Sequence, residues 1–289
     1  MLPLGGTARS AQGAPLSHPP GAPVARLIGL LVFALPLMIV LLAPLLFPGD
    51  PRDPSAAPFL APSLRHPMGT DDLGRDLLAA LAHGGRASLL SGGLVALAAT
   101  ALAIVLGVVA ALSGGTVDRV IVRLMDVSQI VPRFFLALLA TAWLGPGWMT
   151  LAGILALTGW ATLARQIRAE ARSLRHAAFV EAALLLGASR TSVAVRHLAP
   201  LMLPLALPHV PLILCSALLI EAGLCFLGAG DPNRLSWGLL VQTGQAHVLR
   251  AWWLVLFPGM ALALTSVGLT LLALGRSDAD NARHQAAAD

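Results

Sequence analysis

The sequence has no lysine and no tyrosine, and all 19 of its basic residues are arginines. Without lysine the chain has no phosphate-loop lysine, no Schiff-base lysine and no lysine general base. A protein of this composition that uses ATP therefore needs another chain to bind the nucleotide. The sequence alone predicts no catalytic residue.

Cysteine is also scarce. Cys215 and Cys225 are the only two, and they lie in one apolar stretch. Cysteines in such surroundings are usually packed as small hydrophobic residues. We expect two free thiols, with neither a disulfide nor a zinc site.

Charged residues make up 11% of the 289 residues and hydrophobic residues 57%, whereas soluble domains carry about 25% charged residues. So few charges could not coat a soluble globule of this size. This proportion of charged to hydrophobic residues excludes a soluble enzyme and a disordered chain. It also excludes a nucleic-acid-binding domain, although the net charge is +5. It predicts an all-α membrane protein with one domain.

Long charge-free runs indicate where the chain crosses the membrane. The apolar segments are 27–49, 87–117, 134–164, 197–220 and 251–275. The third would measure about 46 Å as one helix, which exceeds a hydrocarbon core of about 30 Å. Gly145-Pro146-Gly147 falls in its middle and is typical of a turn. We therefore predict six spans, two of them joined by this hairpin.

Arginine placement predicts the orientation of the chain. With the N-terminus in the cytoplasm, the inner segments carry more arginines than the outer ones, as the positive-inside rule requires. Residues 1–23 are then a flexible cytoplasmic tail, 24–275 the transmembrane domain and 276–289 a second cytoplasmic tail. A short charged connector follows Gly114-Gly115.

The connector between the fourth and fifth spans is the longest inner segment. Its first arginines share one helical stripe: Arg165, Arg168, Arg172 and Arg175. A second stripe of the same period is apolar: Leu163, Ile167, Ala171 and Leu174. We expect an amphipathic helix that continues out of the fourth span.

A strongly apolar stretch, 179–189, comes next. It predicts a short helix that ends at Gly187, followed by a second one capped by Ser189 and running to about Leu198. An apolar helix on the cytoplasmic side should not face water. It packs against its own chain, lies flat on the lipid surface, or docks into a groove on a partner protein.

Glu181-Ala182-Ala183, Gly187-Ala188-Ser189 and Arg196-His197-Leu198-Ala199-Pro200 together resemble the EAA motif of ABC importer permeases. In that family this loop forms coupling helices that insert into the ATP-binding subunit. The resemblance implies an ATPase-coupling role for six residues: Glu181, Ala182, Ala183, Gly187, Ala188 and Ser189.

Other segments resemble the dipeptide, oligopeptide and nickel permeases, in particular the second of their two unlike permease subunits. These segments are His66 to Leu77, Gly114 to Pro132, and Glu221 to Gly259. The resemblance covers roughly residues 27–275. The sequence departs from the family pattern at Leu184, where a polar or basic residue is usual, and at Leu201, where asparagine is usual.

The resemblance implies a type I ABC importer-like permease with a cytoplasmic coupling-helix loop between spans four and five. Such a subunit lies in the bacterial inner membrane with both termini in the cytoplasm and pairs with a homologous permease. The transporter also contains two ATP-binding subunits, which hold ATP and Mg²⁺, and an extracytoplasmic solute-binding protein. This chain would bind no cofactor and no nucleic acid and would catalyse nothing. Its cargo would be peptides or, alternatively, nickel or a metal chelate.

A secondary transporter driven by an ion gradient is the rival hypothesis. Such proteins carry coupling charges in mid-membrane, and here only Glu221 qualifies. That residue is either solvated at the interface or has a structural or pathway role. The acidic cluster near His66 is expected to cap a helix and pair with Arg75 or Arg86, not to bind metal. The sequence does not identify substrate-binding residues.

Overall fold

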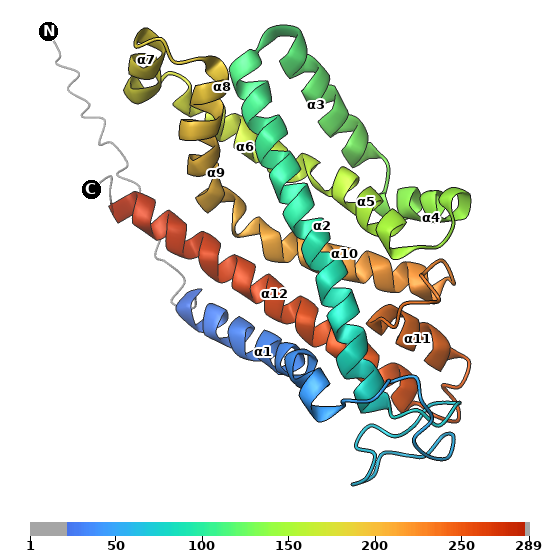
Figure 1. Ribbon diagram of the computed structural model, residues 1–289. Coiled ribbons are helices and arrows are strands. Elements are labelled where there is room, and N and C mark those ends of the chain that lie inside the picture. The colour runs from blue at the N-terminus through green and yellow to red at the C-terminus, as the bar shows by residue number, and fades with distance from the viewer. Residues whose placement is uncertain (1–21, 287–289) are drawn as a thin grey trace, which may run out of the picture.

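The computed structural model describes residues 22–286, and within them the chain is helical with no β-strand (Figure 1). Its helices, in chain order, are α1 (Ala22–Leu46), α2 (Leu77–Ser113), α3 (Gly115–Ile130), α4 (Arg133–Leu144), α5 (Trp148–Gly159), α6 (Ala161–Leu174), α7 (Ala178–Leu185), α8 (Arg190–Val193), the π-helix η1 (Ala194–Leu198), α9 (Ala199–Ala206), α10 (His209–Phe226), α11 (Trp237–Gln245) and α12 (Trp253–Ala286). The all-α fold class is confirmed.

Four helices are long and apolar enough to cross a membrane: α1, α2, α10 and α12. The pair α3 and α4 would make a fifth span, broken by a bend of 86°. The predicted turn at 145–147 is confirmed, because α4 ends at Leu144 and α5 begins at Trp148. The described helices thus provide four or five spans by length and composition, where the sequence predicts six.

Two predicted boundaries were wrong. The second span was expected to start at Ala87, but α2 begins at Leu77, where the Asp76 carboxylate accepts hydrogen bonds from the N–H groups of Leu78 and Ala79. The charged connector expected after Gly115 is instead the helix α3. Its acidic side chains are paired with α6, so they do not force the chain into a solvated loop.

The apolar segment 197–220, expected to begin the fifth span, is broken. It consists of η1, α9 and α10, with Pro204 inside α9 and Pro208 just before α10. Proline removes a backbone donor and clashes with the preceding turn, which explains the break. At the C-terminus, α12 runs past Gly275 to Ala286. The predicted tails lie outside the described residues over 1–21 and 287–289.

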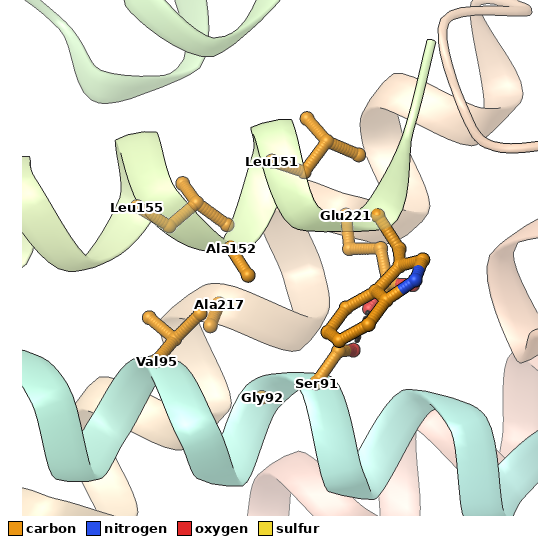
Figure 2. Close-up of a pocket in the computed structure, with 9 residues that line it drawn as sticks. Ser91, Gly92, Val95, Leu151, Ala152, Leu155, Ala217 and Glu221 are labelled. Carbon is orange, nitrogen blue, oxygen red and sulfur yellow. Dashed lines mark hydrogen bonds between the residues drawn. The ribbon is translucent and has the colours of Figure 1, made fainter.

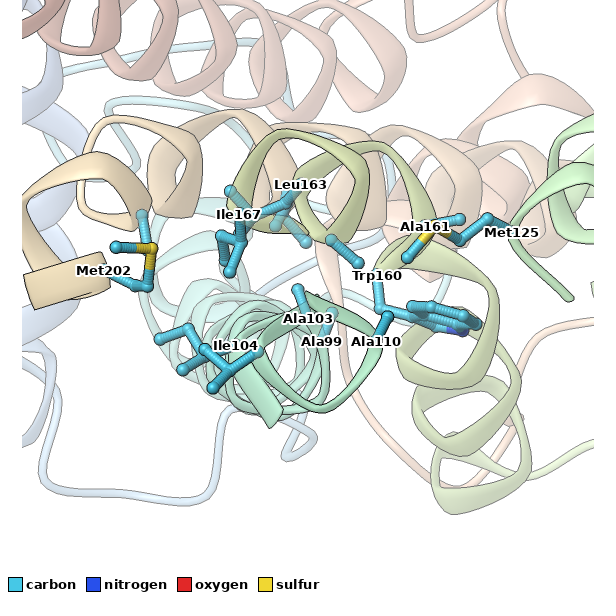
Figure 3. Close-up of a cluster of buried hydrophobic side chains, with 14 of the residues drawn as sticks. Ala99, Ala103, Ile104, Ala110, Met125, Trp160, Ala161, Leu163, Ile167 and Met202 are labelled. Carbon is cyan, nitrogen blue, oxygen red and sulfur yellow. The ribbon is translucent and has the colours of Figure 1, made fainter. Parts of the chain in front are cut away.

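α2 is the central helix and packs against α1, α5, α6 and α10 (Figure 1). Its buried face is made of small residues, so the neighbouring helices approach closely. Figure 3 shows Ala99 and Ala103 of α2 beside Leu163 and Ile167 of α6. A Cβ at Gly107 would lie 2.7 Å from the Ile167 Cγ2 atom. This contact brings the backbone of α6 against that of α2.

α1 lies along α12 on one side of the molecule (Figure 1). Glycines on both helices make the contact possible. A Cβ at Gly29 would lie 2.7 Å from Leu271 Cβ, and one at Gly268 would lie 2.7 Å from the Phe33 nitrogen. The first and last helices are therefore joined by backbone-to-backbone packing.

The loops predicted to be extracytoplasmic pack together at one end of the molecule. The indole of Trp253 donates to the Thr70 carbonyl at 3.2 Å, and the Arg250 guanidinium lies 4.3 Å above the Phe59 ring. The Trp148 N–H donates to the Asp231 carboxylate at 3.3 Å. In Figure 1 the loop between α1 and α2 lies at the opposite end from α7.

Candidate functional site

α6 is the amphipathic helix that the sequence predicts. Leu163, Ile167 and Ala171 are buried along one side of it. On the other side, Arg168 donates to both carboxylate oxygens of Asp118 in α3, at 2.5 and 2.7 Å. Arg165 pairs with Asp126 at 3.0 Å. These two ion pairs hold α6 against α3 just before the chain reaches α7.

α7 ends where the sequence predicts. Gly187 has φ of +86°, a left-handed conformation that glycine adopts without strain. The N–H of Leu186 donates to the Ala182 carbonyl and that of Ala188 to the Ala183 carbonyl, both at 3.0 Å. These bonds satisfy carbonyls at the helix end, so the prediction of a glycine cap is confirmed.

The second short helix also begins as predicted. The Ser189 hydroxyl accepts a hydrogen bond from the Ser192 N–H at 3.1 Å and contacts the Thr191 hydroxyl at 2.9 Å. α8 then continues into η1, which ends at Leu198. α7 and α8 therefore form a compact helix–turn–helix with a cap at each end of the turn.

α7 is anchored by Val180, with Ala183 half-buried beside it, and is mostly exposed elsewhere. Val180 is fully buried in the main core, whereas Leu185 and Leu186 are 87% and 89% exposed. Phe179 and Leu184 are also exposed. In Figure 1 α7 projects from the body of the molecule. Its leucines are thus not buried within the described part of this chain.

The six residues predicted to couple to an ATPase all lie on α7 and the turn after it. Glu181, Ala182, Gly187 and Ser189 are exposed, and Ala183 and Ala188 are half-buried. The exposed apolar residues Phe179, Leu184, Leu185 and Leu186 adjoin them. We call these ten residues the α7 surface.

The acidic cluster before α2 has a structural role. Asp76 caps α2 and pairs with the His66 imidazole at 2.8 Å. The prediction of a cap is confirmed, but the expected arginine partner was wrong, because the fold brings His66 to this carboxylate. Among the residues that the structure describes, no group of three or more His, Cys, Asp or Glu side chains could hold a metal ion.

Glu221 lies in α10 and faces a pocket between α2, α5 and α10 (Figure 2). Its carboxylate accepts a hydrogen bond from the Ser91 hydroxyl at 3.1 Å. Glu221 is half-buried, so interfacial solvation and a structural or pathway role both stay predictions. The sequence reasoning missed Ser91, because nothing in the local pattern links two residues so far apart in the chain.

Comparison with known proteins decides the family. The model of the binding-protein-dependent transport system inner membrane component family matches residues 103–275, which is more than half of the chain. This chain belongs to that permease family. The match includes α5, α6, α7 and α10, and hence the α7 surface and Glu221.

Relatives of this permease have names that point in the same direction. It is 35% identical to the "Putative peptide transport system permease protein" of Brucella suis over 87% of this chain and 85% of the relative. It is 33% identical to the "Probable D,D-dipeptide transport system permease protein DdpC" of Escherichia coli K12, over 86% and 84%. The similarity therefore covers nearly all of both proteins.

Proposed function

We propose that this permease is one of two homologous membrane subunits of an ATP-driven peptide importer in the bacterial inner membrane. The observation that carries the proposal is the α7 surface, an apolar helix that its own chain leaves exposed. Apolar helices of this kind dock into grooves on partner proteins. The relatives named for peptide and D,D-dipeptide transport support peptides as the cargo.

The proposed topology has six spans with both termini in the cytoplasm. The fourth span is α5 followed directly by α6, and the third is the bent pair α3 and α4. The packing of the outer loops at the end opposite α7 supports this arrangement, as does the arginine distribution.

In the proposed mechanism, the α7 surface sits in a groove of an ATP-binding subunit, which holds ATP and Mg²⁺ and carries out hydrolysis. Closure of the ATP-binding subunits moves α7. The Asp118–Arg168 pair ties α6 to α3, so the motion reaches the spans around α2. ATP drives the change because the partner binds it unequally in the inward- and outward-facing states.

Replacing Leu185 and Leu186 together with glutamate tests the α7 surface. Both side chains are exposed, so the variant should insert and fold as the wild type does. Because charged groups would enter an apolar groove, we expect loss of the copurifying ATP-binding subunit and at least a tenfold fall in peptide uptake. Pull-down and uptake of radiolabelled tripeptide into proteoliposomes measure the two effects.

The matched control replaces both leucines with methionine, which preserves the apolar surface and should retain uptake. Glu181→Arg and Gly187→Pro should also abolish uptake while leaving insertion intact. Normal uptake by the glutamate variant would contradict the docking role. Uptake that persists when the partner's ATP site is inactivated would favour a secondary transporter. Uptake of nickel but not of peptide would show that the cargo is nickel or a metal chelate.

A further inference from the structure

The Glu221 pocket contains charged and aromatic groups that the coupling mechanism does not use. Figure 2 shows Ser91 of α2, Glu221 of α10, and Ala152 and Leu155 of α5 around the pocket, which Trp148 also lines. Apart from Ser91 and Glu221, the side chains that line the pocket are apolar or aromatic. The space between them is the size of one water molecule, which is also the size of an ammonium group.

Glu221 has few partners for a carboxylate in an apolar site. It accepts one side-chain hydrogen bond, from Ser91, and among the side chains that the structure describes no Arg or His nitrogen lies within ion-pairing distance of it. A buried carboxylate is costly unless a cation or several donors satisfy it. An ionisable group within a membrane span is by default a candidate functional residue.

A cation, Arg234, packs against Trp148. The Arg234 guanidinium sits 4.2 Å above the Trp148 ring, and its Nη2 donates to the Ala87 carbonyl at 3.0 Å. Its Nη1 is buried and has no hydrogen-bond partner within the described part of the chain. Arg234 and Glu221 thus both adjoin Trp148 without forming an ion pair with each other.

A peptide's free amino terminus supplies the cation that Glu221 lacks. The amino-terminal residue of a peptide carries an ammonium group, which is a cation with three N–H donors. We propose that the Glu221 pocket is a subsite for the free amino terminus of the transported peptide. The ammonium group binds Glu221 and Ser91.

The size of the pocket fits this assignment. Only the ammonium group enters the space beside Glu221, and the remainder of the peptide stays outside it. Specificity for the free amino terminus then does not depend on the peptide's side chains. This inference rests on the proposed peptide import, and it adds a group on the cargo that the permease itself recognises.

Cysteine labelling tests the pocket without relying on transport. Ala152→Cys is introduced after Cys215 and Cys225 are replaced with alanine, and the purified complex is treated with aminoethyl methanethiosulfonate or its neutral methyl analogue. We expect the cationic reagent to react about tenfold faster, relative to the rates of the two reagents with free cysteine. Glu221→Gln should abolish that preference, and Glu221→Asp should keep part of it.

Glu170→Gln, at an exposed glutamate on α6, is the matched control and should leave the preference unchanged. A cationic preference that survives Glu221→Gln would overturn the proposal. So would an equal rate for the two reagents in the protein with Glu221.

Uptake by the reconstituted complete transporter provides the second measurement. A tripeptide and its Nα-acetylated form are compared at concentrations that saturate the solute-binding protein. We expect Glu221→Gln to lower uptake of the free tripeptide about tenfold and leave uptake of the acetylated form unchanged. An equal fall for both peptides would assign Glu221 a purely structural role and overturn the subsite. A wild-type complex that imports neither peptide would instead refute peptide import, while the labelling result would still stand.

Discussion

Asp118 and Arg168 carry opposite charges at the point where α3 and α6 meet, and both side chains are largely buried. Their two hydrogen bonds have the parallel geometry in which arginine binds a carboxylate most strongly. Arg172 lies 3.9 Å from the same carboxylate and adds to the attraction. With the Arg165–Asp126 pair, this cluster links the helix that leads into α7 to the helix that follows α2.

Asp118→Ala should destabilise the permease by about 1–3 kcal/mol, because it leaves the partly buried Arg168 without its carboxylate. The thermal midpoint of the purified complex measures the loss. Exchanging the two residues, Asp118→Arg with Arg168→Asp, should restore part of it.

Arg119→Ala is the control for this pair. Arg119 is exposed, and its hydrogen bonds within the described residues stay in the first turn of α3. The free energy of unfolding should therefore change by no more than about 0.5 kcal/mol. An Asp118→Ala protein with the same thermal midpoint as the wild type would show that the ion pair does not hold the two helices together.

At the residue level, local signals were predictable and distant contacts were not. Gly187 and Ser189 act on backbone groups within a few positions of themselves, so their capping roles follow from the sequence. The Ser91–Glu221 and Asp118–Arg168 contacts join helices whose relative placement the sequence pattern does not specify. The exposure of α7 was only partly predictable. The sequence indicated an apolar helix, but it did not distinguish burial in the chain, contact with lipid and docking on a partner.

At the level of helices, hydropathy located the apolar segments but not all of their ends. α2 begins earlier than expected because Asp76 caps it and its first turns carry buried side chains such as Leu77 and Leu81. Pro132 directly precedes α4 and lies at the bend that ends α3. Charged positions in α3 suggested a loop, since a hydropathy pattern contains no information on ion pairs with α6.

Gly268→Leu should disrupt the packing of α12 on α1. A Cβ at this position would meet the backbone of Phe33 at 2.7 Å, so the helices must separate. We expect the free energy of unfolding to fall by about 1–3 kcal/mol, which is the usual effect of overpacking, and the yield of folded protein to fall as well. Thermal unfolding of the detergent-solubilised chain measures it.

Gly259→Leu is the matched control, because Gly259 lies on the same helix and a Cβ added there would meet no atom of another described element within 4 Å. This variant should unfold at the wild-type temperature when the chain is isolated. Equal losses for the two variants would show that leucine destabilises α12 by itself and that the close approach to α1 contributes nothing.

For the whole molecule, the two ends of the bundle differ in character. One end gathers the loops around Thr70, Asp231 and Trp253, and the other carries α7. The fold class and the turn at 145–147 were predictable because they depend on composition and local breakers. The number of spans was less predictable, because α3 and α6 combine charged and apolar faces.

Single cysteines at opposite ends test the proposed orientation. In a chain freed of Cys215 and Cys225, Leu64→Cys should react with a membrane-impermeant maleimide added to intact spheroplasts, and Leu185→Cys only after lysis. Both positions are exposed, so access to the reagent decides the outcome. Labelling of Leu185→Cys in intact spheroplasts would reverse the topology and place α7 beyond the reach of a cytoplasmic ATPase.

The close packing of α1 on α12 has a consequence for synthesis. α1 meets this neighbour only after α12 has been synthesised and has entered the bilayer, since Gly29 packs on Leu271 and Gly268 on Phe33. A nascent chain that stops before Trp253 leaves the glycine-containing face of α1 open to lipid. Translation must therefore pass through α12 before the bundle closes, and a product truncated before α12 keeps this face of α1 exposed.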